Sequence, residues 1–266
     1  MSNFPNDCID RFSYLARNGD NDPHLPERFF LTHKLLCVYR NTPYHAKIYD
    51  TMMELSSKFL QRLQNDGFED MCEIAMGLSI YREYSSRVSR DPLPNEVEAR
   101  EVASGSNLFE VLTNALVWFP IFESLGVHVL NKAEFQLHVD TIMYREKDQC
   151  EDEREYIDQL DMVCLKVIMG SEWGHKEITR REFQREYDFL MVEIPTIRSL
   201  QNPEVLGKVI FALEQLGGVD ENLIEGLQED LLELAGSRCT FAPSNASPYI
   251  KMHFIFGACL GFSQHI

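Results

Sequence analysis

The sequence predicts an all-α protein built from about six antiparallel helical hairpins, which form an α/α toroid or a curved helical solenoid. Three observations lead to this fold class. Apolar residues recur at helical spacing along nearly the whole chain. Gly and Pro together number only 25 of 266 residues, too few for a protein with frequent tight turns. Several apolar helical segments also end in glycine at nearly regular intervals.

The clearest helical stripe consists of Ile48, Met52, Leu55, Phe59 and Leu63, which step by four, three, four and four residues. This spacing places all five side chains on one face of a long helix. Similar stripes predict further helices over residues 157–167, 183–191, 205–216 and 223–234, and Pro26 opens a helix that carries residues 29–39.

Two helix starts carry a specific signal. Asn202-Pro203 and Ser247-Pro248 each combine a side chain that caps a helix with a Pro at the first helical position. We therefore expect helices to begin at both places.

Glycines at the ends of apolar helices suggest the hairpin repeat. They are separated by 49, 44, 47 and 44 residues, intervals that suit one hairpin each. Chance alignment of helix-ending glycines is the alternative, and it leaves the protein all-α. The glycines are Gly77, Gly126, Gly170, Gly217 and Gly261.

A single domain spanning residues 1–266 is expected, with a few departures from the helical pattern. The polar segment 91–107 is typical of a mobile linker or surface excursion, and residues 238–248 of a long loop. The acidic segment 147–155 suits a solvated helix end or turn. Only residues 127–129 resemble a strand, and they are too short to found a sheet.

The formal net charge of −17 argues against binding to nucleic acid or to an anionic membrane surface. It favours a basic protein, a basic peptide or a cationic ligand as partner, although charge that merely keeps the protein soluble is the alternative. The longest apolar run, residues 115–122, is too short for a membrane helix and contains Pro120.

The start of the chain lacks the basic and apolar regions of a secretion signal, and the seven cysteines contain no CxxC pair. We therefore expect a cytoplasmic protein with reduced thiols.

No motif identifies a cofactor. Gly217-Gly218 has no following Lys, as a phosphate loop requires, and a GxSxG nucleophile elbow is absent. His33 and Cys37 lie four residues apart, so a thiol–imidazole pair is within reach, but a plain core contact is the more common outcome.

Metal ligands are equally sparse. Glu172 and His175 form one Glu-x-x-His copy where a di-iron bundle needs two, and HExxH is absent. Glu134 and His138 share one helix face, which gives at most two ligands. We therefore predict neither a metal nor an organic cofactor.

The candidate site residues are His33, Glu134, His138 and His253. All three histidines lie in mainly apolar helical segments, so the inward helices of a toroid would bring these polar groups to a central cavity. The alternative is that each His is buried and hydrogen-bonded locally.

Two reactions known on α/α toroids do not fit. Glycosidases need a pair of carboxylates and an aromatic cleft rich in Trp, and the chain has two Trp and no recognisable acid pair. The acidic motifs of isoprenoid cyclases, DDxxD and DxDD, are absent.

Leu31-Thr32-His33 and the stretch 59–73 resemble an uncharacterised bacterial family of helical-hairpin proteins whose genes often lie beside those for natural-product biosynthesis. The resemblance covers about fifty residues, and residues 38–41 replace the Thr-Asp-Phe-Gly that follows Leu-Thr-His in the family. It implies a toroid-like fold and no particular activity.

The first functional hypothesis is a binding or scaffold protein that engages a peptide or protein partner through its acidic surface or a concave cavity, as an accessory to a biosynthetic pathway. The second is an enzyme that acts on a small molecule or modified peptide, with His and Glu as acid–base groups. A small effector or immunity protein of a virus or mobile element is a third.

Overall fold

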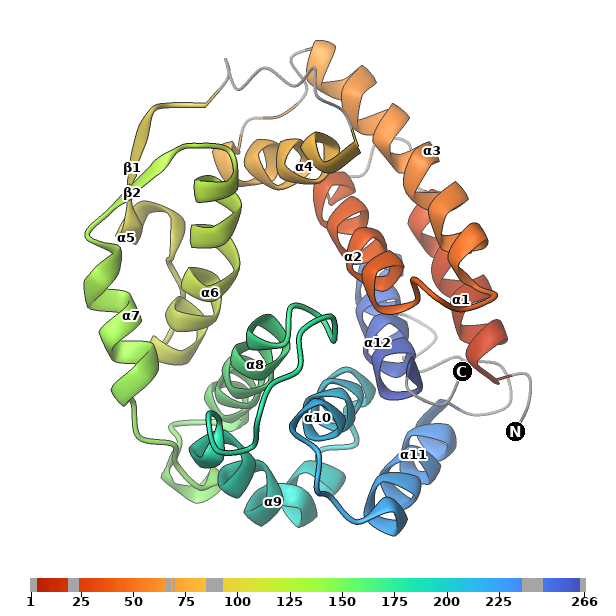
Figure 1. The fold of residues 1–266 in the computed structure, drawn as a ribbon, viewed down its shortest axis with the longest axis vertical. Helices are drawn as coiled ribbons and strands as arrows, with labels where there is room; N and C mark the ends of the chain where they lie inside the picture. The colour runs from red at the N-terminus through yellow and green to blue at the C-terminus, as the bar shows by residue number, and fades with distance from the viewer. Residues whose placement is uncertain are drawn as a thin grey trace. The chain divides into compact units, whose positions relative to one another are not determined.

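A computed structural model describes residues 4–18, 24–65, 68, 70–84, 93–235 and 246–263, and it confirms the helical fold class (Figure 1). In chain order the elements are α1 (Phe4–Arg17), α2 (Leu25–Val38), α3 (His45–Gln64), α4 (Met71–Tyr84), β1 (Glu96–Glu98), α5 (Ala99–Val102), α6 (Leu108–Ser124), β2 (His128–Leu130), α7 (Lys132–Thr141), the 3-10 turn η1 (Lys147–Gln149), α8 (Glu153–Gly170), α9 (Gln184–Ser199), α10 (Pro203–Leu216), α11 (Glu221–Ala235) and α12 (Pro248–Gly261).

The helices belong to two compact units. The first unit comprises residues 1–19, 34–51 and 163–266, and the second comprises residues 20–33 and 52–162. Among the described residues, no helix is both long enough and apolar enough to cross a membrane.

The predicted helix starts are confirmed. Asn202 accepts hydrogen bonds from the backbone N–H groups of Glu204 and Val205, and Ser247 accepts one from Ile250. In both helices a Pro follows the cap, so the first turn needs one donor fewer. Local sequence therefore determines where α10 and α12 begin.

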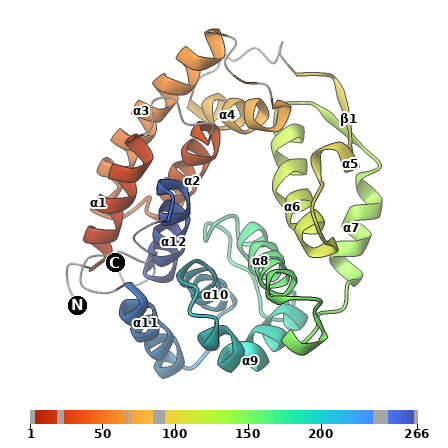
Figure 2. The same ribbon diagram turned by 180° about the vertical axis from the view of Figure 1, so that it is seen from behind.

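The core of the first unit is centred on α10, which packs against α12, α9 and α11, while α1 also packs on α12 (Figure 2). The contact between α10 and α12 is close because both helices carry glycine there. A Cβ added to Gly207 would lie 1.8 Å from the carbonyl oxygen of Gly257. The two backbones can approach this closely only without side chains at these positions.

Four of the five repeat glycines lie at helix ends. Gly170 and Gly261 are the last residues of α8 and α12, and Gly126 and Gly217 follow α6 and α10 with φ of 76° and 66°. The left-handed conformation of the latter two favours glycine as a helix stop.

Gly77 corrects the pattern, because it lies in the middle of α4 rather than at its end. A Cβ there would lie 2.1 Å from the ring of Phe59, which is fully buried. The packing of α3 on α4 therefore explains Gly77. The 49-residue interval between Gly77 and Gly126 does not connect two helix ends, unlike the other three intervals.

The second unit contains a two-stranded sheet that the helical spacing of apolar residues did not predict. β1 and β2 pair in parallel with Val97 opposite Val129, and both of these side chains are buried. The expectation that residues 127–129 cannot found a sheet is thus wrong. Residues 128–130 pair with a strand some thirty residues earlier, in a segment rich in polar residues.

Of the predicted excursion, residues 93–107 are described and residues 91–92 lie outside the described residues. The described part forms β1 and α5, and α5 packs on α6 with Ala99 and Val102 buried. The acidic segment 147–155 was predicted to be a solvated helix end or turn, and it forms η1 and the start of α8. Of the predicted loop 238–248, residues 238–245 lie outside the described residues.

Candidate binding groove and polar clusters

The structure gives the four predicted site residues three different environments. His33 lies in α2, Glu134 and His138 lie in α7, and His253 lies in α12. Glu134 and His138 lie on the same helix. His33 contacts the carboxylate of Glu83, whereas His253 contacts that of Glu204. Each environment therefore has its own neighbours and its own chemistry.

His33 is a buried residue of the second unit. Its Nε2 lies 3.0 Å from Oε2 of Glu83, and its ring meets Tyr84 edge-on at a centroid distance of 5.9 Å. The His33 side chain is 2% exposed, whereas the Glu83 side chain is 57% exposed. This geometry fits a core histidine whose polar edge reaches a surface carboxylate.

Glu134 and His138 are both exposed on α7. His138 thus lies on an exposed face, although its segment was predicted to be a mainly apolar helix. The reason is that α7 is a surface helix of which Val139 is the buried residue, so most of its circumference faces solvent.

His253 belongs to a polar cluster between α10 and α12. Its Nδ1 lies 3.2 Å from Oε1 of Glu204, and the same oxygen accepts a hydrogen bond of 2.8 Å from Nζ of Lys208. Tyr249 packs its ring edge-on at 4.6 Å from the imidazole. The side chains of Glu204, Lys208 and His253 are 19%, 10% and 19% exposed, so this is a nearly buried ion cluster.

The electrostatics of the cluster stabilise the carboxylate. Burial alone opposes the charge on Glu204, but the Lys208 ammonium and the hydrogen bond from His253 outweigh it and hold the pKa of Glu204 below its usual range. A carboxylate that holds one imidazole nitrogen is an arrangement that acid–base and metal sites use. Here the other nitrogen, Nε2, is buried as well.

Glu214 is a second unusual acid of the first unit. It lies near the end of α10, and burial raises the pKa of its carboxyl to about 8. The neutral form is therefore favoured in the folded protein at neutral pH. The sequence pattern does not distinguish this residue, because a Glu within an amphipathic helix normally lies on its solvated face.

We expect Glu214 to make stability depend on pH. Its folded-state pKa is raised, so the folded protein holds a proton that the unfolded chain loses above about pH 4.5. Stability falls as the pH rises from about 4.5 to about 8 and then levels off. In Glu214→Gln this loss, on the order of 2–4 kcal/mol, should disappear.

The measurement is urea unfolding followed by circular dichroism at pH 5 and pH 8. Glu225→Gln, which changes an exposed acid of α11, is the matched control. If Glu214→Gln and Glu225→Gln reduce the loss of stability between pH 5 and pH 8 by the same amount, Glu214 is not the group responsible for that loss.

A cavity lies between α6 and α7 in the second unit. It has a volume of about 390 Å³ and is open to solvent. Phe119 and Phe135 form part of its wall, with their rings edge to face at a centroid distance of 5.6 Å. Ala115, Leu116, Pro120, Ala133 and Val139 complete the apolar lining. We call this cavity the α6–α7 groove.

The rim of the groove is polar. Glu123 and Lys132 form an ion pair across it, from the last turn of α6 to the first residue of α7. Gln136 also lines the groove, and its amide lies 3.3 Å from both carboxylate oxygens of Asp140. The polar residues that line the groove are therefore one carboxylate, one ammonium and one amide, of which the two charges pair with each other.

Pro120 removes one backbone hydrogen bond from α6. It lies inside α6 and has no N–H, so the carbonyl of Leu116 cannot receive the usual helix hydrogen bond from position 120. Both residues line the groove. The apolar run 115–122, which is too short for a membrane helix, thus supplies one wall of a solvent-accessible cavity.

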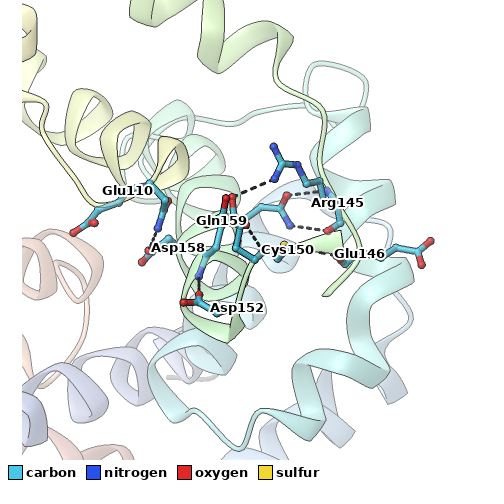
Figure 3. A network of polar contacts seen from close by, with 10 residues as sticks. Glu110, Arg145, Glu146, Cys150, Asp152, Asp158 and Gln159 are labelled. Atoms are coloured by element: carbon cyan, nitrogen blue, oxygen red, sulfur yellow. Dashed lines mark hydrogen bonds and ion pairs between the residues drawn. The ribbon is translucent and has the colours of Figure 1, made fainter. Parts of the chain in front are cut away.

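A polar network fastens the chain that follows α7 onto α8 (Figure 3). The side-chain amide of Gln159 accepts from the backbone N–H of Arg145 and donates to its carbonyl, both at 2.8 Å. The Arg145 guanidinium reaches Glu155 at 3.2 Å, and Glu155 accepts from the backbone N–H of Glu151 at 2.7 Å. This network holds the backbone of Arg145, which follows the end of α7, against α8.

A second part of the network joins α6 to α8 (Figure 3). Asn107 caps α6 by accepting from the N–H of Glu110, and its amide donates to Asp158 at 2.7 Å. Burial raises the pKa of Asp158, whereas two hydrogen bonds from Ser106 lower the pKa of Glu110. The α6 wall of the groove is thus anchored at its N-terminus.

Removing the Gln159 amide should loosen this anchor. Gln159 is fully buried, so Gln159→Leu leaves two backbone groups of Arg145 without their partner at a cost of about 2–3 kcal/mol. Thermal unfolding measures the loss, and exchange of the Arg145 amide hydrogen should accelerate with it. Gln136→Leu, an exposed amide of α7, is the control and should change stability by less than about 0.5 kcal/mol. Equal effects would contradict the anchoring role.

Within the described ranges no group of three or more His, Cys, Asp or Glu side chains is arranged to hold a metal ion. Comparison with known proteins gives no identification, since no family model, no curated protein and no solved structure matches the chain.

Proposed function

We propose that this chain is a helical binding protein that engages a peptide or protein partner through the α6–α7 groove. The observation that carries the proposal is an apolar, solvent-open cavity of about 390 Å³ whose walls are two aromatic rings and whose rim is charged. Interface anchor sites have this composition, because an apolar side chain gains from burial while a polar rim gives orientation.

The proposed cellular role rests on two further features. The net charge of −17 favours a basic partner, and the resemblance to a family encoded near biosynthesis genes suggests an accessory role in such a pathway in the cytoplasm. A binding function requires neither a catalytic motif nor a set of metal ligands.

We also propose that the helices form successive antiparallel hairpins in a closed toroid or a curved solenoid. The contacts of α9 with α10, of α10 with α11 and of α6 with α7 support hairpins, and the contact of α1 with α12 supports closure. Small-angle scattering tests this arrangement, because a compact chain of this length has a radius of gyration of about 18 Å. A much larger value would contradict closure.

Photo-crosslinking in cells tests the binding function. A benzophenone amino acid replaces Gln136 at the groove, or Val192 on α9 as an exposed control in the other unit. We expect a discrete crosslinked partner from position 136 that is absent from position 192.

The groove is then closed by Ala133→Trp, which places an aromatic side chain in the lining. Leu137→Trp adds the same side chain to the same helix outside the lining. Crosslinks that persist in the first variant, or vanish equally in both, would argue against the groove as the binding site.

One contact favours the alternative, an enzyme with His and Glu acid–base groups. Glu204 holds Nδ1 of His253, as a carboxylate does for a general base. Diethyl pyrocarbonate modification read by mass spectrometry separates the cases. A reactive base should be modified as fast as the exposed His138, and a structural histidine as slowly as the buried His33. The burial of Nε2 leads us to expect the slow result.

A further inference from the structure

The turn that follows α8 holds three consecutive residues in the left-handed region of backbone conformation. Glu172, Trp173 and Gly174 have φ of 48°, 60° and 86°. Glycine adopts such angles freely, whereas a residue with a Cβ is destabilised by them, and for a bulky side chain they are a true outlier. Two of the three positions are therefore strained. We call residues 171–176 the α8 turn.

Hydrogen bonds to the last turn of α8 hold the strained residues in place. The backbone N–H of Glu172 donates to the carbonyl of Met169 at 3.0 Å, and that of Trp173 donates to the carbonyl of Ile168 at 2.9 Å. This pair of bonds is the Schellman motif, in which the position of Glu172 is usually glycine. The α8 turn is thus a helix end that carries a glutamate where glycine is favoured.

The side chain of Trp173 is buried under opposing influences. Trp173 is 8% exposed, its ring lies edge-on to Phe256 of α12 at a centroid distance of 6.3 Å, and Nζ of Lys34 lies 5.5 Å from the ring centroid. These contacts favour burial. The indole N–H is buried as well, yet no group in the described part of the chain accepts a hydrogen bond from it. A buried donor without an acceptor opposes burial.

The backbone strain and the buried indole donor act on the same short segment. Both are relieved if the α8 turn opens, because the backbone can then leave the left-handed region and the N–H can reach water. Opening breaks the ring contacts of Trp173 and a few hydrogen bonds of the turn, and it leaves the helices around it intact. Strained residues of this kind are concentrated in switch regions of proteins.

We propose that the α8 turn is a latch that opens while the rest of the first unit stays folded, and that it carries Trp173 from the core into solvent. The open form presents the indole and uncovers the ring of Phe256, which is 2% exposed in the closed form. A rigid helix end that opens only on unfolding is the alternative. The latch lies on other elements than the α6–α7 groove, so it does not depend on the proposed binding function.

Hydrogen exchange of the full chain, followed by nuclear magnetic resonance at low urea concentrations, tests the latch. The probes are the indole and backbone N–H groups of Trp173, and Val209, a fully buried residue of α10, reports unfolding of the unit. Trp118→Phe assigns the indole signal, because the chain has two tryptophans. We expect protection factors at Trp173 at least about a hundredfold smaller than at Val209 and independent of urea, as local opening requires.

A matched pair of variants tests whether strain drives the opening. Glu172→Gly relieves the strain at its position, so the protection factor of the Trp173 backbone N–H should rise about fivefold or more. Gln201→Gly is the control, because Gln201 follows α9 with a φ of 49° and is strained in the same way. We expect it to leave exchange at Trp173 unchanged.

Two results would overturn the proposal. Protection at Trp173 that equals protection at Val209 and falls with urea in parallel would show that the turn opens only when the unit unfolds. An equal rise at Trp173 in Glu172→Gly and Gln201→Gly would show the same, because stabilisation elsewhere in the unit would then control the exchange.

Discussion

Gly207→Ala should be among the most destabilising single substitutions in the chain. The added Cβ would lie 1.8 Å from the carbonyl oxygen of Gly257 and 2.3 Å from its carbonyl carbon. Both are backbone atoms within a helix, so neither can rotate away, and α10 must separate from α12. We expect a loss of about 3 kcal/mol or more in the free energy of unfolding.

Gly226→Ala is the matched control in α11. Its Cβ would meet only the end of the Arg198 side chain, at 3.0 Å, and that side chain is flexible. Replacing a helical glycine by alanine then gains about 0.5–1 kcal/mol. Urea unfolding at one pH measures both variants. If Gly207→Ala is as mild as Gly226→Ala, the close approach of α10 and α12 is incorrect.

Lys208→Met is the second substitution with a large expected effect. Methionine keeps the length and apolar stem of the side chain but removes the ammonium that lies 2.8 Å from Glu204. The nearly buried carboxylate then has His253 as its remaining described partner in this cluster. We expect a loss of about 2–4 kcal/mol at neutral pH, because an uncompensated buried charge is costly.

Two comparisons test the cause of this loss. The double variant Glu204→Gln, Lys208→Met removes both charges and should recover most of the stability, since neutral replacement of a buried pair is often tolerated. Lys58→Met breaks the pair with Glu54, which has the same four-residue spacing but is much more exposed than Lys208 and Glu204, and should cost less than about 0.5 kcal/mol. Equal losses in Lys208→Met and Lys58→Met would contradict the proposed burial effect.

The cluster of Glu204, Lys208 and His253 should also make the stability of the fold depend on pH in the acid range. Because the folded-state pKa of Glu204 is lowered, its contribution is present above the unfolded value near 4.5 and is lost as the pH falls below it. The contribution of Glu214 has the opposite sign, because it falls as the pH rises above about 4.5. Stability should therefore be greatest between the acid range in which Glu204 is protonated and the higher range in which Glu214 ionises.

The helices could be predicted from the sequence because the apolar spacing and the caps are local signals. Asn202 and Ser247 mark helix starts through hydrogen bonds that span two or three residues, and the structure has both. Gly77 shows the limit of such reasoning. Nothing near it in the sequence distinguishes a glycine that ends a helix from one that admits the ring of Phe59.

The polar cluster and the groove were harder to predict from the sequence, because the burial of their residues depends on helices that lie far apart in the sequence. Glu204 and Lys208 show the ordinary spacing of a surface ion pair, and only the packing of α12 buries them. Residues 115–122 and the helix of Glu134 and His138 were both distinctive in the sequence. Their shared groove depends on how α6 and α7 pack, which helical periodicity does not specify.

Nuclear magnetic resonance of methyl groups during titration with indole tests the central claim most directly. Indole at millimolar concentration is small enough for the groove and presents an aromatic surface to Phe119 and Phe135. We predict saturable shifts at the methyls of Ala115, Ala133 and Val139 in the wild-type chain and in Leu137→Trp, and their disappearance at Ala115 and Val139 in Ala133→Trp. Shifts that are absent from these methyls, or that remain unchanged in Ala133→Trp, would show that the α6–α7 groove is not a binding site.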